Sequence, residues 1–107
     1  MPTAAYPEAF HEYVESIMRL SKQKPGTLVT NLDIAKDLDI KPPSVSEMIP
    51  KLEEAKLVVW EKRKGVKLTE QGVKLASLVM QQPTAAQARK TAERFMDERF
   101  PELAAEL

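Results

Sequence analysis

The fold is decided by residues 34–69, which read IAKDLDIKPPSVSEMIPKLEEAKLVVWEKRKGVKLT. A short helix pattern meets a break at 39–41, and a second amphipathic helix opens with the Pro-Pro-Ser of 42–44. Two β-prone runs, 57–62 and 66–68, then flank a basic turn. Helix, turn, helix and hairpin in this order are the plan of a winged helix-turn-helix, so we expect a mostly α-helical chain with a small β-wing.

The rest of the chain adds helices before and after this unit. Thr30 and Asp33 have the spacing of a capping box, as do Thr84 and Gln87, and Thr69 is placed to cap the helix after the hairpin. We therefore expect five helices, over about 7–23, 31–38, 42–55, 70–80 and 85–98, a short strand at 28–29 and a last helical segment between Pro101 and Leu107.

Apolar residues recur on one side of each helix, and this recurrence predicts the core. Pro50 removes the amide that would bond to Ser46, but we keep the helix because its apolar period continues through the proline. Tyr13 and Trp60 are interpreted as packing aromatics rather than as ligand-stacking groups. The predicted core is Phe10, Tyr13, Val14, Ile17, Leu20, Leu32, Ile34, Ala35, Leu38, Val45, Met48, Ile49, Leu52, Val73 and Ala76, with Val79 or Met80.

Composition places the chain among ordinary globular proteins and disfavours several functions. Its 107 residues suit one domain, and its 43% hydrophobic and 30% charged fractions suit a folded soluble protein. There is no cysteine for a disulfide or a thiolate metal site, and one histidine without a Gly-rich phosphate loop or a nucleophile elbow predicts that the chain is not an enzyme. No apolar run approaches the roughly 18 residues of a membrane span, so we expect a cytoplasmic protein with no membrane partner.

The charges are balanced overall but unevenly distributed. The formal net charge is zero, yet residues 41–74 hold eight Lys or Arg against five Asp or Glu. The positive charge thus gathers on the second helix of the pattern and on the hairpin, where contacts to phosphate would be needed. An ordinary solvated surface remains the alternative explanation of this excess.

From His11 to Met80 the chain resembles the N-terminal domain of the diphtheria-toxin-repressor family of iron- and manganese-dependent transcription regulators. The resemblance is carried by Tyr13-Val14-Glu15-Ser16-Ile17, Asp33-Ile34-Ala35 with Leu38, Lys41-Pro42-Pro43-Ser44-Val45-Ser46-Glu47-Met48, Lys51-Leu52-Glu53-Glu54-Ala55-Lys56-Leu57-Val58 and Gly65-Val66-Lys67-Leu68-Thr69-Glu70-Gln71-Gly72. It implies a winged helix that places its second helix-turn-helix element, residues 42–55, in the DNA major groove.

The resemblance also assigns DNA contacts, most of them on the first turns of that helix. Small hydroxyls and a helix N-terminus bind phosphate, and apolar edges contact thymine methyl groups. Lys41 stands where the family has a small capping residue, and Pro50 has no counterpart there, so the preferred DNA sequence is expected to differ. The predicted DNA-binding residues are Lys41, Pro43, Ser44, Ser46, Glu47 and Lys51, with Arg63 and Lys64 at the wing tip, where Lys62 is a further basic residue.

The family's metal site is where the chain departs from the resemblance. Family members place carboxylate or thioether ligands at the positions of Glu12 and Glu15, and a histidine at the position of Pro83. Residues 84–107 supply no His or Cys, and first-row metals usually require imidazole or thiolate beside carboxylates. His11, Glu12 and Glu15 are therefore interpreted as a solvated helix face, and we expect no metal site and no cofactor.

Together these observations predict a sequence-specific transcription regulator that binds double-stranded DNA as a homodimer and is not switched by metal. Residues 1–82 would form the DNA-binding domain, and residues 83–107 a helical dimerisation extension that presents Ala85, Ala88, Ala92, Phe95, Met96, Phe100, Leu103 and Leu107. The alternative for this extension is that it folds back on the first helix and the protein is a monomer. The alternative is a winged-helix protein-interaction module, which the neutral net charge also suits. A third reading keeps a metal switch at a different site.

Overall fold

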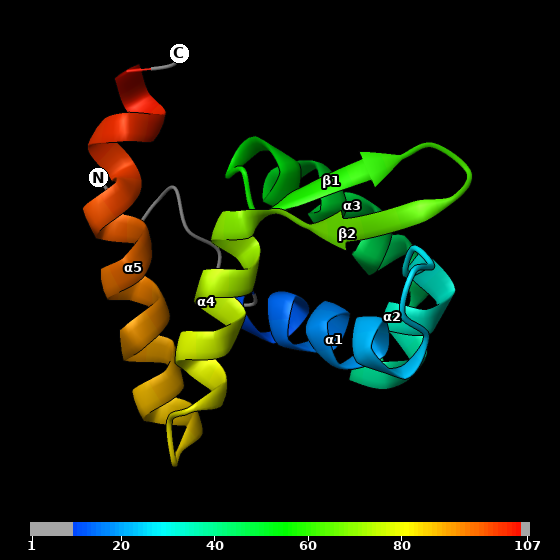
Figure 1. Ribbon diagram of the computed structural model, residues 1–107, viewed down its shortest axis with the longest axis horizontal. Coiled ribbons are helices and arrows are strands. Elements are labelled where there is room, and N and C mark those ends of the chain that lie inside the picture. Colours follow the sequence, from blue (N-terminus) through cyan, green and yellow to red (C-terminus); the bar gives the residue numbers. More distant parts are fainter. Residues whose placement is uncertain (1–9, 106–107) are drawn as a thin grey trace.

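The computed structural model describes residues 10–105, with side chains for residues 10–98. The elements run in the order α1 Phe10–Gln23, α2 Asn31–Leu38, α3 Pro42–Glu54, β1 Val58–Glu61, β2 Gly65–Leu68, α4 Glu70–Met80 and α5 Ala85–Ala105 (Figure 1). This order confirms the winged helix-turn-helix, although the predicted start of the first helix at Pro7 lies outside the described residues. Within the described part, no helix has the length and apolar character that a membrane crossing requires.

The helix-turn-helix is set by its caps. The Thr30 hydroxyl accepts a hydrogen bond from the Asp33 amide at 3.1 Å, which starts α2 as the sequence predicted. Asp39 then adopts a left-handed conformation, φ 55° and ψ 49°, and the Ile40 amide returns to the Ala35 carbonyl at 3.0 Å. This tight end turns the chain directly into α3.

The wing is a two-stranded antiparallel hairpin joined at one edge by a third segment. β1 and β2 pair with Val58 opposite Leu68 and Glu61 opposite Gly65. Val29 exchanges two backbone hydrogen bonds with Val66, at 2.8 and 2.9 Å, which confirms the short pairing expected at 28–29. Gly65 has φ +134°, and a Cβ there would collide with the Val29 carbonyl, so only glycine fits between these segments.

The start of α4 is locked onto the turn before the wing. The Thr69 hydroxyl accepts from the Gly72 amide at 3.0 Å and donates to the Lys56 carbonyl at 2.6 Å. The Thr69 amide donates to the Leu57 carbonyl at 3.0 Å, and a Cβ on Gly72 would collide with the same carbonyl. The Leu-Thr-x-x-Gly sequence is therefore a packing requirement as well as a helix cap.

The two helices after the wing lie side by side and antiparallel, and α5 extends past the start of α4 (Figure 1). α5 also touches α1. The sequence predicted that Pro101 would interrupt the last helix, but α5 runs without a break to Ala105. A proline inside a helix removes one amide donor and is absorbed by a local bend, so it does not oblige the helix to end.

Most of the predicted core is buried, but several assignments were wrong. Leu32, Val73 and Trp60 are exposed, with exposed fractions of 41–59%, whereas the unpredicted Leu75 is fully buried. Of the alternatives Val79 and Met80, Val79 is the buried one. α4 turns its Gly72 face inward, because only that face fits against the Leu57 carbonyl, and this rotates Val73 outward. His11, expected to be solvated, is buried at 6%.

Candidate nucleic-acid interface

The outer face of α3 is polar and exposed. Val45, Ile49 and Leu52 are buried beneath the helix, and the predicted contact residues lie on the opposite side. All six of them are exposed: Lys41, Pro43, Ser44, Ser46, Glu47 and Lys51. The helical period therefore turns the whole predicted set to solvent, as a helix that enters a groove requires.

The start of α3 offers few amides to a phosphate. Its first two positions are Pro42 and Pro43, which have no N–H, and the Ser44 amide donates to the Lys41 carbonyl at 3.0 Å. Lys41 makes no side-chain cap. We expected the helix N-terminus itself to attract phosphate, but the positive charge at this end comes from the Lys41 side chain.

A hydrogen bond that the sequence did not predict joins the two helices of the motif. The Asn31 side-chain amide donates to the Ser46 hydroxyl at 3.2 Å, linking the first residue of α2 to the exposed face of α3. Sequence reasoning treated Asn31 only as the beginning of a helix. No local signal marks this contact, because it joins two residues 15 positions apart on different helices.

Pro50 lies within α3, which continues to Glu54 as the apolar period predicted. Pro50 is exposed, so its ring faces solvent and does not disturb the core. The Ser46 carbonyl loses its usual helical donor at this point. This missing backbone hydrogen bond lies in the middle of the outward face of α3, between Ser46 and Lys51.

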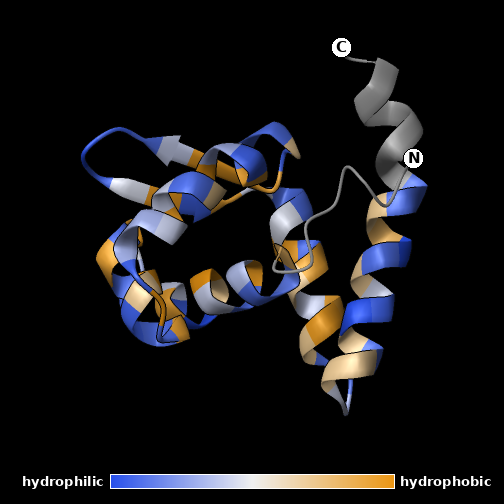
Figure 2. Ribbon diagram, turned by 180° about the vertical axis from the view of Figure 1, so that it is seen from behind, coloured by the Kyte–Doolittle hydropathy of each residue, from blue (hydrophilic) through white to orange (hydrophobic). Residues whose placement is uncertain are grey.

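The wing tip carries three consecutive basic side chains. Lys62, Arg63 and Lys64 are exposed, and the tip reaches beyond the helical body as a strongly hydrophilic loop (Figures 1 and 2). Arg63 has a φ of 69°, and the Lys64 amide closes the turn on the Glu61 carbonyl at 2.9 Å. Arg63 thus makes the left-handed residue of the bend together with Gly65, which was expected to supply the bend alone.

Trp60 stands on the wing strand and not in the core. Its side chain is 41% exposed, beside Val59 at 40%, while its backbone amide donates to the Glu53 carboxylate at 3.3 Å. That bond covers the outer edge of β1 with a side chain from α3. An exposed tryptophan next to a basic tip extends the candidate surface along the hairpin.

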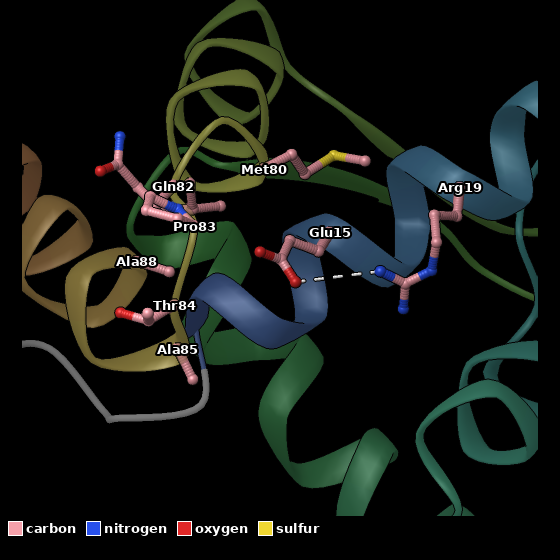
Figure 3. A pocket seen from close by; sticks show the side chains of 9 residues that line it. Glu15, Arg19, Met80, Gln82, Pro83, Thr84, Ala85 and Ala88 are labelled. Carbon is pink, nitrogen blue, oxygen red and sulfur yellow. Dashed lines mark ion pairs between the residues drawn. The ribbon is translucent and has the colours of Figure 1, made fainter.

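Two of the three positions that match family metal ligands are brought together, but their side chains do not make a metal site. Glu15 and Pro83 line one open groove of about 380 Å³, with Arg19, Met80, Gln82 and Thr84 (Figure 3). Pro83 has no donor atom, and Glu12 is exposed outside this lining. Within the described residues, no three His, Cys, Asp or Glu side chains gather closely enough to hold an ion. These residues do not fit a resident metal.

Arg19 forms an ion pair with Glu15, the carboxylate that lines the groove. Its guanidinium lies 3.8 Å from Glu15 and donates to the Asp37 carboxylate of α2 at 2.7 Å. Partial burial raises the pKa of Asp37, but the nearby Ser16 hydroxyl and the Arg19 guanidinium outweigh this, and the pKa lies below its ordinary value. Asp37 is therefore ionised at neutral pH.

Comparison with known proteins agrees with this architecture. Residues 7–66 match the family described as iron dependent repressor, N-terminal DNA binding domain. The chain is 36% identical over 75 residues to the HTH-type transcriptional regulator MntR of Geobacillus thermodenitrificans, covering 70% of this chain and 49% of that protein. It is 34% identical over 67 residues to MntR of Bacillus subtilis, covering 63% and 46%. The chain thus spans about half the length of these curated relatives.

Proposed function

Because this chain belongs to the iron dependent repressor family of DNA-binding domains, we propose that it is a cytoplasmic, sequence-specific transcription regulator. α3 would enter the major groove of double-stranded DNA, and the wing tip would contact the phosphate backbone. The observation that carries the proposal is the uncovered polar face of α3 beside an exposed tip of three basic residues.

The wing tip and α3 would have different roles in DNA binding. Lys62, Arg63 and Lys64 would neutralise phosphates and release counterions, which gives affinity without sequence preference. Ser44, Glu47 and Lys51 would reach base edges from α3. The alternative, a protein-interaction module, predicts binding that does not fall steeply with salt.

The test combines selection from random duplex DNA with salt titration. A bound consensus is expected, with affinity that falls with salt at a log–log slope of about −0.9 per phosphate neutralised. Arg63→Ala with Lys64→Ala should weaken all sequences alike and reduce the slope by about 1 for each charge. Lys22→Ala with Lys24→Ala, exposed at the end of α1, is the matched control and should change neither quantity.

Substitutions on α3 should act on sequence preference. Ser44→Ala or Lys41→Ala is expected to change which sequences are selected and to alter discrimination by about 1–3 kcal/mol at the affected base pair. If the selected sequences stay the same in both variants while overall affinity falls, these side chains contact only the backbone. If wild-type protein selects nothing and binds independently of salt, the interaction module is the correct function.

We infer that the protein binds DNA as a homodimer, with 83–107 as part of the dimerisation region. The sequence predicted that this segment presents an apolar face to a second copy. That reason has to be revised, because Ala88, Ala92 and Met96 are buried within one chain, 0–6% exposed. The apolar surface still available on α4 is Val73, Leu78 and Met80, each 40–42% exposed. Two-fold pairing would set two copies of α3 about one DNA turn apart, at ~34 Å.

Light scattering tests the dimer at micromolar concentration. Leu78→Glu with Met80→Glu should shift a dimer to the monomer mass, because a buried carboxylate without a partner is costly at an interface. Leu32→Glu, at a residue 59% exposed on α2, is the control and should leave the mass unchanged. A wild-type chain with the mass of a monomer would refute the dimer.

We also propose that metal does not switch DNA binding. Support comes from the side chains of the groove, where Pro83 lacks a donor and Arg19 neighbours Glu15. Calorimetric titration with manganese, iron(II) or zinc should give no micromolar binding that changes DNA affinity. A tight single-site isotherm coupled to stronger DNA binding would instead indicate a metal sensor that uses a different site.

A further inference from the structure

Arg19 joins two places that are far apart in the sequence. On one side it neighbours Glu15, which lines the groove beside the turn between α4 and α5 (Figure 3). On the other side it donates to Asp37, in the last turn of α2 and two residues before the left-handed Asp39. The planar guanidinium has two nitrogens available for this, Nη1 toward Glu15 and Nη2 toward Asp37.

We propose that Arg19 is a positioning residue for DNA reading, a built-in cation that holds α2 against α1 without an effector. The inference rests on the proposed function. α2 packs on both α1 and α3, and Asn31 bonds to Ser46 on the reading face. A change in the angle between α1 and α2 is therefore transmitted to the outer face of α3.

Arg19 and Glu15 lie in the groove where the family resemblance would place a metal ion. Glu15 and Pro83 are two of the three positions that the family resemblance matches to metal ligands, and both line this groove. Here the positive charge beside Glu15 is covalently part of α1, so it is always present. A second cation placed at Glu15 would be repelled by the guanidinium, which lies 3.8 Å from that carboxylate.

The effect is expected to be modest, since Arg19 is 42% exposed and Asp37 is 24% exposed. An ion pair of this kind changes an equilibrium by up to about fivefold. Lys22, in the last turn of α1, is an exposed basic residue of the same helix. Lys22→Ala, which removes a positive charge from the same helix, is therefore a matched control.

The experiment is a double-mutant cycle on the full chain, read by DNA titration at several salt concentrations and by thermal unfolding. Arg19→Ala and Asp37→Ala should each lower DNA affinity about two- to fivefold, and the double variant should be no weaker than either single variant. Arg19→Lys should keep part of the affinity. The salt slope should not change, because Arg19 contacts no phosphate in this proposal.

Four outcomes would overturn the role of Arg19. Three concern affinity: no change in Arg19→Ala, additive losses in the double variant, or an equal loss in Lys22→Ala. The fourth is a salt slope lower by about 1 in Arg19→Ala, which would make Arg19 a phosphate contact. Thermal unfolding identifies a variant whose affinity falls only because part of it is unfolded. Wild-type protein that does not bind duplex DNA would overturn the proposed function itself, and the wild-type titration is read first for that reason.

Discussion

α4 and α5 begin with the same device in different surroundings. The Thr69 hydroxyl accepts the Gly72 amide at 3.0 Å, and the Thr84 hydroxyl accepts the Gln87 amide at 3.2 Å. Thr69 also bonds to the Lys56 carbonyl, whereas Thr84 lines the open groove and donates to the side chain of its own Gln87 at 3.3 Å. Thr69 therefore links the start of α4 to the turn before the wing, whereas the Thr84 hydroxyl bonds to Gln87, within the first turn of α5. We expect substitutions at Thr69 to disturb the fold more than substitutions at Thr84.

The largest effect is expected from Gly72→Ala. The new Cβ would collide with the Leu57 carbonyl, so α4 would have to separate from the turn that it locks. We expect a loss of about 2–4 kcal/mol in the free energy of unfolding, measured by urea denaturation. Gly26→Ala is the control: Gly26 has φ +85° but open space around it, and strain alone should cost about 1–2 kcal/mol. Equal losses in the two variants would mean that the contact at Gly72 is not tight.

The two threonine caps can be compared directly. Thr69→Val removes a cap and a tertiary hydrogen bond and should cost about 1–3 kcal/mol, whereas Thr84→Val removes only a cap and should cost about 1 kcal/mol. Thr69→Ser should retain most of the stability. A Thr84→Val variant as destabilised as Thr69→Val would show that the groove is as constrained as the wing junction.

A pH titration tests the packed side of α1. Burial, followed by the charge of Glu12, raises the pKa of Tyr13 above its ordinary value near 10. A raised pKa in the folded state means that stability is fully present below the unfolded-state value and is lost as the pH rises through the folded-state value. Stability should therefore decline more steeply above pH ~10 in the wild type than in Tyr13→Phe. Identical alkaline curves would show that Tyr13 ionises as freely in the folded protein as in the unfolded one.

The smallest effect is expected in the groove. Pro83→Ala should change the free energy of unfolding by less than about 1 kcal/mol, since Pro83 is exposed and its main influence is on the unfolded chain. DNA affinity should stay within about twofold, a change of under 0.5 kcal/mol. A large loss in either quantity would make this proline a structural requirement.

The elements were predictable because their signals are local. Thr30, Thr69 and Thr84 each mark a helix start, and helical periodicity continues through Pro50, so the order and most boundaries follow from the residues alone. The outward set on α3 was predictable for the same reason. These features depend on spacing along one segment, which the sequence displays directly.

What the sequence did not reveal depends on contacts between segments. The inward face of α4 is set by the approach of Gly72 to Leu57, and so Leu75 was missed. His11 is polar and yet buried where α1 enters the core, and Trp60 is apolar and yet exposed on the hairpin. The bonds from Asn31 to Ser46 and from Arg19 to Asp37 cross between helices, and residue spacing carries no record of them.

α3 carries few side chains that can read base edges, and the hydrogen bond from Asn31 involves one of them, Ser46. Its sequence contains no Arg, Asn or Gln, so Lys51 is the one side chain of α3 suited to a paired contact with guanine. The Ser46 hydroxyl already accepts the hydrogen bond from Asn31. Much of the discrimination would then come from how easily a duplex bends and how narrow its minor groove is beneath the wing. In such an operator, base pairs that no side chain touches would influence affinity as strongly as those that α3 contacts.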